Sequence, residues 1–215
     1  MHKKKSLFVT FEGIEGSGKS YQSKKLFKNL KKKNIPVILT REPGGTAGAE
    51  KIRRIILQDY FDPNFKKQFN KYTDTLLYLA ARNEHIVNKI KPAISDKKVV
   101  ICDRFIDSTM AYQVYGKRIN KNFVDNIHKH ILGKTKPDQT FILKVNISKA
   151  FQRLNKRKKK NRYDKFSKNF YLKVQNSFIK IARNNKKRCF VLDNSKDSKE
   201  TEKIILNKII AILQR

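Results

Sequence analysis

The sequence predicts an α/β protein with a five-stranded, mostly parallel sheet and helices on both faces. Five short runs of apolar and β-branched residues lack the alternation of a strand with one solvated face, so each should be buried on both sides. Segments with apolar residues at helical spacing separate these runs, as in α/β folds. The 215 residues contain no internal repeat and no Pro-, Gly- or Ser-rich linker, which predicts a single domain over residues 1–215.

The predicted elements alternate along the chain. Five apolar runs are expected strands: SLFVTFEG (residues 6–13), IPVILTR (35–41), KVVICDR (98–104), DQTFILKV (138–145) and KRCFVLD (187–193). Helical spacing predicts helices over residues 19–33, 49–58, 72–90, 108–114, 121–132 and 199–215. We expect the third helix to end before Pro92, because proline lacks the N–H that a helix interior requires.

The net charge of +33 is the most conspicuous feature of the composition. A strongly basic chain suggests a nucleic-acid partner. However, the 39 lysines outnumber the 12 arginines and are dispersed over most of the expected helices, and lysine lacks the planar fork with which arginine binds phosphates. We therefore favour a solvated lysine-rich surface with no specific nucleic-acid partner.

Neither a membrane nor an oxidising compartment is indicated. No apolar run approaches the roughly 18 residues of a membrane span, and the basic opening MHKKK precedes a strand-like run without a small-residue cleavage site. Cys102 and Cys189 both lie in apolar strand-like runs, so we expect buried thiols instead of a disulfide. These features predict a cytoplasmic protein.

The segment FEGIEGSGKS carries three of the chain's eight glycines. Residues 13–20 fit the pattern G-x-x-x-x-G-K-[ST] of a phosphate-binding P-loop, between an expected strand and an expected helix. Glycines permit backbone angles that point successive amide hydrogens at phosphates, and the helix dipole adds positive potential. The lysine would reach the β- and γ-phosphates and the serine hydroxyl would bind Mg²⁺. We expect a nucleoside triphosphate to contact Gly13, Ile14, Glu15, Gly16, Ser17, Gly18, Lys19 and Ser20.

Four more motifs follow: TREPGGT (40–46), LLYLAAR (76–82), DRFIDS (103–108) and AYQ (111–113). In this order and at these separations the set resembles the thymidylate kinase family, from about residue 6 to the end of the chain. The resemblance implies the P-loop nucleoside monophosphate kinase fold and commonly a homodimer. It also implies transfer of the γ-phosphoryl group of ATP to dTMP, with Mg²⁺, giving dTDP for dTTP synthesis.

The resemblance assigns substrate-binding roles to three residues outside the P-loop. Arg82 matches a helix arginine that helps to hold the base and the phosphate. Tyr78, one turn earlier, takes the place of an aromatic residue that stacks on thymine; the family usually has Phe there, so the hydroxyl needs a partner. Core packing is the alternative role for this tyrosine. Arg53 resembles the arginine that grips the dTMP phosphate, and Arg54 beside it is a rival.

The ends of the expected strands supply further candidates. Asp103 and Arg104 end a buried strand, where the aspartate can reach Mg²⁺ and the arginine the transferred phosphoryl group. By resemblance, Glu15 would contact the 3′-hydroxyl of the substrate sugar. Glu42 and Pro43 would border the substrate cleft.

Three residues of the helix after the third strand complete the expected substrate site. By resemblance, Thr109 and Gln113 would hydrogen-bond the thymine edge. Tyr112 resembles a tyrosine that crowds the 2′ position and so favours deoxyribose. Ordinary helix positions are the alternative reading for all three.

A basic segment, LNKRKKKNRYDKF, lies where the family has a mobile lid, at about residues 155–166. The P-loop has no Arg or Lys between its first and last glycines, so we expect lid arginines to stabilise the transferred phosphoryl group. Arg162 resembles the arginine of the family's D-R-x-E, although Asn161 and Asp164 replace the usual acids, and Arg157 is the other candidate. A solvated loop or a nucleic-acid contact is the alternative. The expected catalytic residues are Lys19, Arg104, Arg157 and Arg162.

Two other functions stay open on the residues alone. One is a nucleotide kinase for a deoxynucleoside or another monophosphate, since Tyr78 and Thr109 leave base selectivity unsettled. The other is an RNA- or DNA-binding P-loop protein, which would need aromatic residues along a basic stripe and a second NTPase motif; the sequence contains neither. His85, His128 and His130 suggest no metal site.

Overall fold

The structure, a computed structural model, describes residues 6–57, 69–156, 162–195 and 198–214. The strands in these ranges are β1 (Leu7–Glu12), β2 (Val37–Arg41), β3 (Val99–Asp103), β4 (Gln139–Lys144) and β5 (Cys189–Asp193). They form one sheet in the order β2-β3-β1-β4-β5, and each neighbouring pair is parallel. The predicted five-stranded parallel sheet is confirmed, with each strand end within two residues of its expected position.

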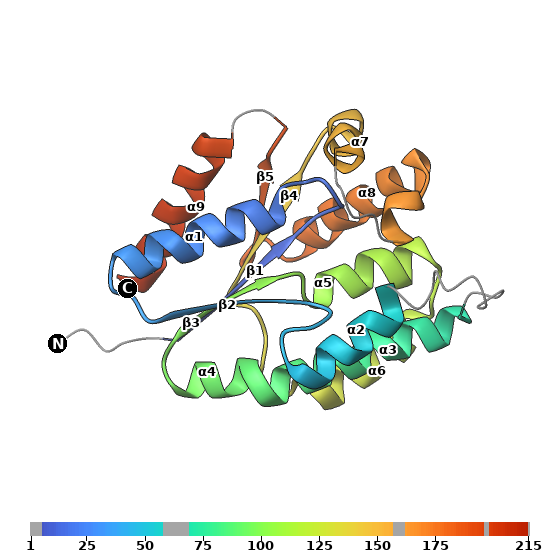
Figure 1. Ribbon diagram of the computed structural model, residues 1–215, viewed down its shortest axis with the longest axis horizontal. Helices are drawn as coiled ribbons and strands as arrows, with labels where there is room; N and C mark the ends of the chain where they lie inside the picture. The colour runs from blue at the N-terminus through green and yellow to red at the C-terminus, as the bar shows by residue number, and fades with distance from the viewer. Residues whose placement is uncertain (1–5, 58–68, 157–161, 196–197, 215) are drawn as a thin grey trace.

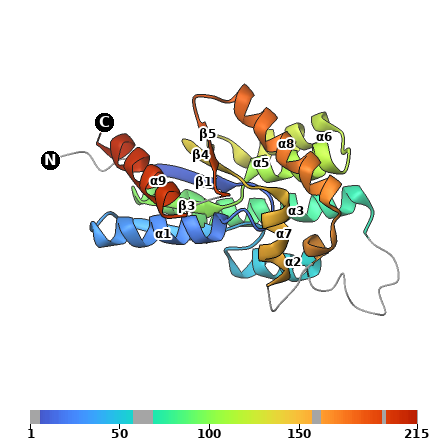
Figure 2. The same cartoon turned by 90° about the horizontal axis from the view of Figure 1, so that it is seen from above.

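Helices connect the strands and cover both faces of the sheet, with α1 and α9 on one side and α4 on the other (Figure 1). The α-helices are α1 (Lys19–Lys32), α2 (Ala47–Leu57), α3 (Lys71–His85), α4 (Lys91–Ser95), α5 (Ile106–Thr109), α6 (Lys121–Leu132), α7 (Ile147–Asn155), α8 (Lys168–Asn184) and α9 (Ser198–Leu213). Two π-helical segments, η2 (Ile86–Ile90) and η3 (Met110–Gly116), and a 3₁₀ turn, η4 (Arg162–Lys165), complete the helical structure described. Figure 2 shows α2, α3, α7 and α8 gathered at one end of the molecule, away from the outer ends of α1 and α9.

The central strand β1 is buried on both faces because its alternate side chains enter different clusters. Val9 packs with Leu26 of α1 and Ile205 of α9. Its neighbour Phe8 points to the opposite face and packs with Ile90 of η2, as the two-residue period of a strand requires. This two-sided burial explains why the strands read as continuous apolar runs.

The helical segment that begins with α3 continues past Pro92, so the expectation that it would end there is wrong. The segment passes from α3 through η2 into α4 and ends at Ser95. Within η2 the N–H of Lys91 is bonded to the carbonyl of Ile86, five residues back, which shifts the bonding register just before the proline. Pro92 therefore lies in the first turn of α4, where a missing N–H leaves no helical bond unmade.

Cys102 and Cys189 are buried free thiols, as the sequence predicts. Burial raises the pKa of Cys102 well above its ordinary value and that of Cys189 to about 12, so both remain protonated at neutral pH. Within the described ranges, no helix has the length and apolar character needed to cross a membrane.

Candidate active site

A cavity of about 180 Å³ lies at the edge of the sheet where β1, β2 and β3 end. The three strands are parallel neighbours, so the loops after them converge there, where open α/β sheets bind ligands. The cavity is lined by thirteen residues expected from the sequence: Glu15, Lys19, Ser20, Glu42, Pro43, Arg53, Tyr78, Arg82, Asp103, Arg104, Thr109, Tyr112 and Gln113. Four described residues that the sequence did not single out also line it: Arg41, Leu57, Ser108 and Tyr163.

The P-loop joins β1 to α1 and requires glycine for two separate reasons. Gly13 and Gly16 have φ angles of +139° and +74°, which side chains rarely tolerate. A Cβ on Gly16 would also lie 2.6 Å from the carbonyl oxygen of Ala150 in α7. The loop is therefore compressed between the sheet and α7 in the conformation that its glycines allow.

Lys19, the first residue of α1, is buried and turned back over the loop. Its Nζ donates to the carbonyl of Ile14 at 2.7 Å and lies 3.4 Å from the hydroxyl oxygen of Ser17. Burial and the charge of Arg104 lower the pKa of this lysine to about 7. A phosphate anion at the loop would add negative charge beside Lys19 and raise its pKa again.

Ser20 and Asp103 meet at the entrance to the P-loop. The serine hydroxyl donates to the aspartate Oδ2 at 2.5 Å, so two oxygen ligands of the kind that Mg²⁺ prefers are adjacent. The described residues contain no group of three or more His, Cys, Asp or Glu side chains that could hold a metal ion. These two residues would hold a Mg²⁺ ion, which would supply positive charge at this edge of the cavity.

Arg104 follows β3 with a φ of +75° and turns across the cavity toward the P-loop. Its guanidinium donates to the carbonyl of Gly13 at 2.9 Å and to Glu15 at 2.7 Å. Tyr112 donates its hydroxyl to the other carboxylate oxygen of Glu15. Burial raises the pKa of Glu15, but Arg104 and Lys19 outweigh it and hold the pKa below its usual range. Glu15 is thus an ionised part of the cavity wall and not a solvated loop residue.

Glu12, the last residue of β1, lies behind this group. One carboxyl oxygen accepts the backbone N–H of Phe105 at 2.8 Å, and the other accepts the Ser108 hydroxyl at 2.6 Å. Burial and the nearby Asp107 raise the pKa of Glu12 to about 8. The folded protein therefore keeps this carboxyl protonated at pH values where the unfolded chain has lost the proton.

We expect Glu12→Gln to remove a pH-dependent loss of stability. Because the folded-state pKa is raised, the stability of the unsubstituted protein should fall between about pH 4.5 and pH 8 on account of this residue. Calorimetric melting temperatures at pH 6 and pH 9 should show a gain from Glu12→Gln that grows with pH. Glu200→Gln on an exposed position of α9 is the control, and a gain independent of pH would contradict the prediction.

Arg41 at the end of β2 and Arg53 in the helix that follows both line the cavity. Arg53 of α2 lines it and donates to the carbonyl of Pro43 at 2.7 Å, whereas Arg54 is exposed and absent from the lining. Burial and the charge of Arg41 lower the pKa of Arg53, and Arg104 adds to the effect. Four arginines line the cavity, and the mutual repulsion of Arg41, Arg53 and Arg104 makes the space between them a site for an anion.

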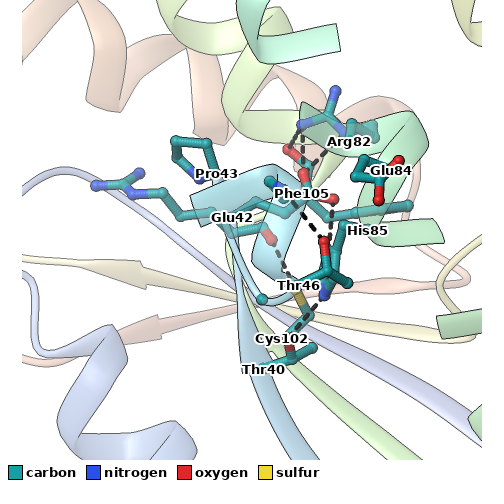
Figure 3. Close-up of polar contacts among 12 residues, drawn as sticks. Thr40, Glu42, Pro43, Thr46, Arg82, Glu84, His85, Cys102 and Phe105 are labelled. Carbon is teal, nitrogen blue, oxygen red and sulfur yellow. Dashed lines mark hydrogen bonds and ion pairs between the residues drawn. The ribbon is translucent and has the colours of Figure 1, made fainter. Parts of the chain in front are cut away.

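Arg82 of α3 is buried in the cavity wall and all three of its guanidinium nitrogens are engaged. It pairs with Glu42 at 2.7 Å (Figure 3) and donates to the Thr109 hydroxyl at 2.8 Å and to the carbonyl of Phe105 at 2.9 Å. The remaining contact, at 2.8 Å, is with Nε2 of His128. Burial and Arg82 lower the pKa of His128 to about 3, so its neutral ring accepts this hydrogen bond.

Gln113 in the π-helical segment η3 is a polar residue of the cavity wall with spare hydrogen-bonding capacity. Its side chain is 2% exposed, and its amide nitrogen has no hydrogen-bond partner in the described part of the chain. π-helical turns are frequent at functional sites because they change which side chains face inward.

The hydroxyl of Tyr78 is hydrogen-bonded to the hydroxyl of Tyr163, a residue of η4 that lines the cavity. The neighbouring Arg162 is buried, forms an ion pair with Asp74 of α3 and lies 3.3 Å from the Tyr78 hydroxyl. It does not line the cavity, contrary to what a lid arginine at the phosphoryl group requires. The cause is Asp74, a buried carboxylate 88 residues away in sequence. The other candidate, Arg157, lies outside the described residues.

Arg153 near the end of α7 is a further residue that the sequence did not single out. It donates to the carbonyl of Gly16 in the P-loop at 2.9 Å and to that of Asn194 at 3.2 Å. Asn194 in turn donates to the carbonyl of Ser17 at 2.7 Å. The position of Arg153 just before the lysine-rich segment was the sequence signal that could have marked it as a candidate. Tyr163 could have been proposed because it follows Arg162.

The family model for thymidylate kinase matches residues 11–205. Thymidylate kinase of Mycoplasma capricolum is 40% identical over 209 residues, covering 94% of this chain and 96% of that protein; that of the Wolbachia of Brugia malayi is 41% identical over 210 residues, covering 95% and 96%. The crystal structure of thymidylate kinase from Ehrlichia chaffeensis matches with a TM-score of 0.71 and 36% identity, over 97% of this chain and 99% of the other. The chain belongs to the thymidylate kinase family.

Proposed function

We propose that this protein transfers the γ-phosphoryl group of ATP to dTMP, giving ADP and dTDP. The observation that carries the proposal is the buried amide nitrogen of Gln113, which has no partner in the described residues and belongs to the same cavity as Lys19 of the P-loop. A buried donor without an acceptor costs stability. We therefore assign this donor to a carbonyl oxygen of the thymine base.

The P-loop side of the cavity would bind ATP. Lys19 and the loop amides would hold the β- and γ-phosphates, and Ser20 and Asp103 would hold Mg²⁺, which neutralises phosphate charge when bound. Arg104 bonds the P-loop and lines the cavity, so it would be in reach of both nucleotides. Catalysis would then come from positioning and from charge stabilisation, without a covalent intermediate.

The opposite side would bind dTMP. Arg53, crowded by two other arginines, would receive the monophosphate, and the ring of Tyr78 would stack on the base. The Thr109 oxygen already accepts from Arg82, so its O–H proton is directed elsewhere and suits a base carbonyl. Tyr112 and Glu15, which are bonded to each other, would lie against the deoxyribose.

The lid role stays a prediction for both arginines of the basic segment. Arg162 would have to leave Asp74 to reach a phosphoryl group, and such exchanges accompany lid closure in kinases. Met substitutions of Arg157 and Arg162, made separately, test the role. The lid arginine should lower kcat with little change in the KM for ATP, and the other should not.

The experiment that tests the function is a coupled measurement of ADP release with Mg²⁺ and ATP, adding dTMP, dUMP, dCMP, dGMP or UMP one at a time. Release triggered chiefly by dTMP is the expected result. Release triggered by another monophosphate would keep the phosphoryl transfer and change the substrate. Release without an acceptor, or only with nucleic acid, would contradict the kinase proposal.

We also propose a homodimer that buries one face of α3 and η2. Leu76 and Val87 lie on this face and are 47% and 48% exposed, large values for apolar side chains eleven residues apart on one helical surface. A two-fold axis would pair this face with its own copy. Leu76→Glu should convert the dimer into a monomer in sedimentation velocity, whereas Leu172→Glu, at an equally exposed leucine of α8, should not. A monomeric unsubstituted protein would refute the dimer.

A further inference from the structure

Two buried histidines take no part in the proposed reaction, and one of them supports the loop whose Pro43 carbonyl accepts a hydrogen bond from Arg53. We propose that His85 is a positioning residue for the monophosphate site and acts through Glu42. The inference rests on the proposed function, since it concerns the site assigned to dTMP. Figure 3 shows His85 and Glu42 side by side, with Thr40 on the far side of the ring.

The hydrogen bonds of His85 define its tautomer. Its Nδ1 lies 3.1 Å from Oε1 of Glu42, and its Nε2 lies 2.7 Å from the hydroxyl of Thr40. The carboxylate can only accept, so Nδ1 carries the proton and donates it, while Nε2 accepts from the threonine. Thr40 therefore fixes the tautomer that Glu42 needs.

Glu42 is held at two points as a result. His85 binds Oε1 and Arg82 binds Oε2 at 2.8 Å, and both side chains come from the last turn of α3. One contact alone would leave the carboxylate free to rotate about its bond. Two contacts to different oxygens fix its plane and, with it, the backbone that continues into Pro43.

The backbone of the same loop also rests on the histidine. A Cβ on Gly45 would lie 2.6 Å from Nε2 of His85 and 2.5 Å from the hydroxyl oxygen of Thr40. The loop from Glu42 to Gly45 is therefore supported by His85 at its carboxylate and at its glycine. Between these points lies the carbonyl of Pro43, which accepts from Arg53 at 2.7 Å. His85 thus sets the position of the arginine assigned to the dTMP phosphate without contacting the ligand.

Two substitutions separate the contacts of His85. An asparagine amide reaches the place of Nδ1 and can still donate to Glu42, whereas a glutamine amide reaches the place of Nε2 and can contact only Thr40. We expect His85→Gln to raise the dTMP dissociation constant, measured by calorimetry without ATP, about tenfold or more, the factor expected for losing a hydrogen bond to a charged group. We expect His85→Asn to stay within about threefold of the unsubstituted protein, and neither variant to change the KM for ATP more than about twofold.

A second measurement tests whether the histidine acts through the arginine. In an Arg53→Met background, His85→Gln should weaken dTMP binding no further, because the group it positions is gone. Equal effects of the Gln and Asn variants, effects that follow only the melting temperature, or an additive double variant would each overturn the inference. If the unsubstituted protein neither binds nor phosphorylates dTMP, the proposed function fails and the inference fails with it. Normal dTMP turnover with any of the three contrary results overturns the inference alone.

Discussion

Replacing Lys19 by Met should lower kcat about a thousandfold, the size of effect seen when a preorganised charge at a reacting group is removed. The melting temperature of the ligand-free protein should meanwhile rise. Lys19 is buried and its pKa is lowered to about 7. Folding therefore either desolvates the charged ammonium or removes its proton, and both lower the free energy of unfolding. Methionine fills similar space without that cost.

The sign of the pH dependence distinguishes this effect from simple repacking. The unfolded chain binds the lysine proton more tightly than the folded protein does between about pH 7 and pH 10.5, so stability due to this residue rises with pH across that window. The advantage of Lys19→Met should therefore be greatest below pH 7 and vanish near pH 10.5. Lys24→Met, at an exposed position of the same helix, should change neither kcat nor stability. A variant that melts earlier than the unsubstituted protein at pH 6 would show that this account of Lys19 is mistaken.

Gln113→Leu should have the second largest effect, again with opposite signs for function and stability. Removing the unpartnered amide spares the folded protein a buried donor, which corresponds to about 1–3 kcal/mol in the free energy of unfolding. The same change should lower kcat/KM for dTMP about a hundredfold and reduce the preference over other monophosphates, because a base carbonyl loses its donor. Both quantities come from denaturant titration and from the coupled assay.

Gln175→Leu is the matched control for this prediction. Gln175 is also buried, but its amide nitrogen and oxygen both bond the backbone of Val145 at 3.0 Å. The identical substitution should therefore destabilise the protein there and leave dTMP selectivity unchanged. Stability changes of the same sign at the two positions would contradict the assignment of Gln113 to a ligand.

The part of the site that the sequence predicts is the part built from local signals. The spacing of three glycines within the six residues before Lys19 is typical of a phosphate-binding loop, and parallel strands place the residues that follow them at one edge. Asp103 and Ser20 could be expected to meet on these grounds, and they do. The fold followed from the same reasoning, since continuous apolar runs separated by helices leave few arrangements.

What the sequence did not predict depends on partners far away along the chain. The role of Asp74 as the ion-pair partner of Arg162 is a tertiary contact with no local sign. The passage of a helix through Pro92 depends on a π-helical turn, whose residues have no distinctive pattern. Tyr163 enters the cavity because its hydroxyl meets that of Tyr78 across 85 positions, a pairing that a single sequence does not reveal.

Arginine and lysine make different contacts in this protein, and the difference helps to locate ligand sites in lysine-rich sequences. Of the ten arginines in the described part of the chain, seven donate to a carboxylate or a backbone carbonyl, and they are Arg41, Arg53, Arg82, Arg104, Arg153, Arg162 and Arg188. In a protein whose cationic surface is built almost entirely from lysine, an arginine is the exception and marks a place where a planar fork is required. Lysine would be a poor replacement at these seven positions, although it keeps the positive charge. In a sequence rich in lysine, the positions of the arginines therefore indicate structured polar contacts and the ligand site better than the net charge does.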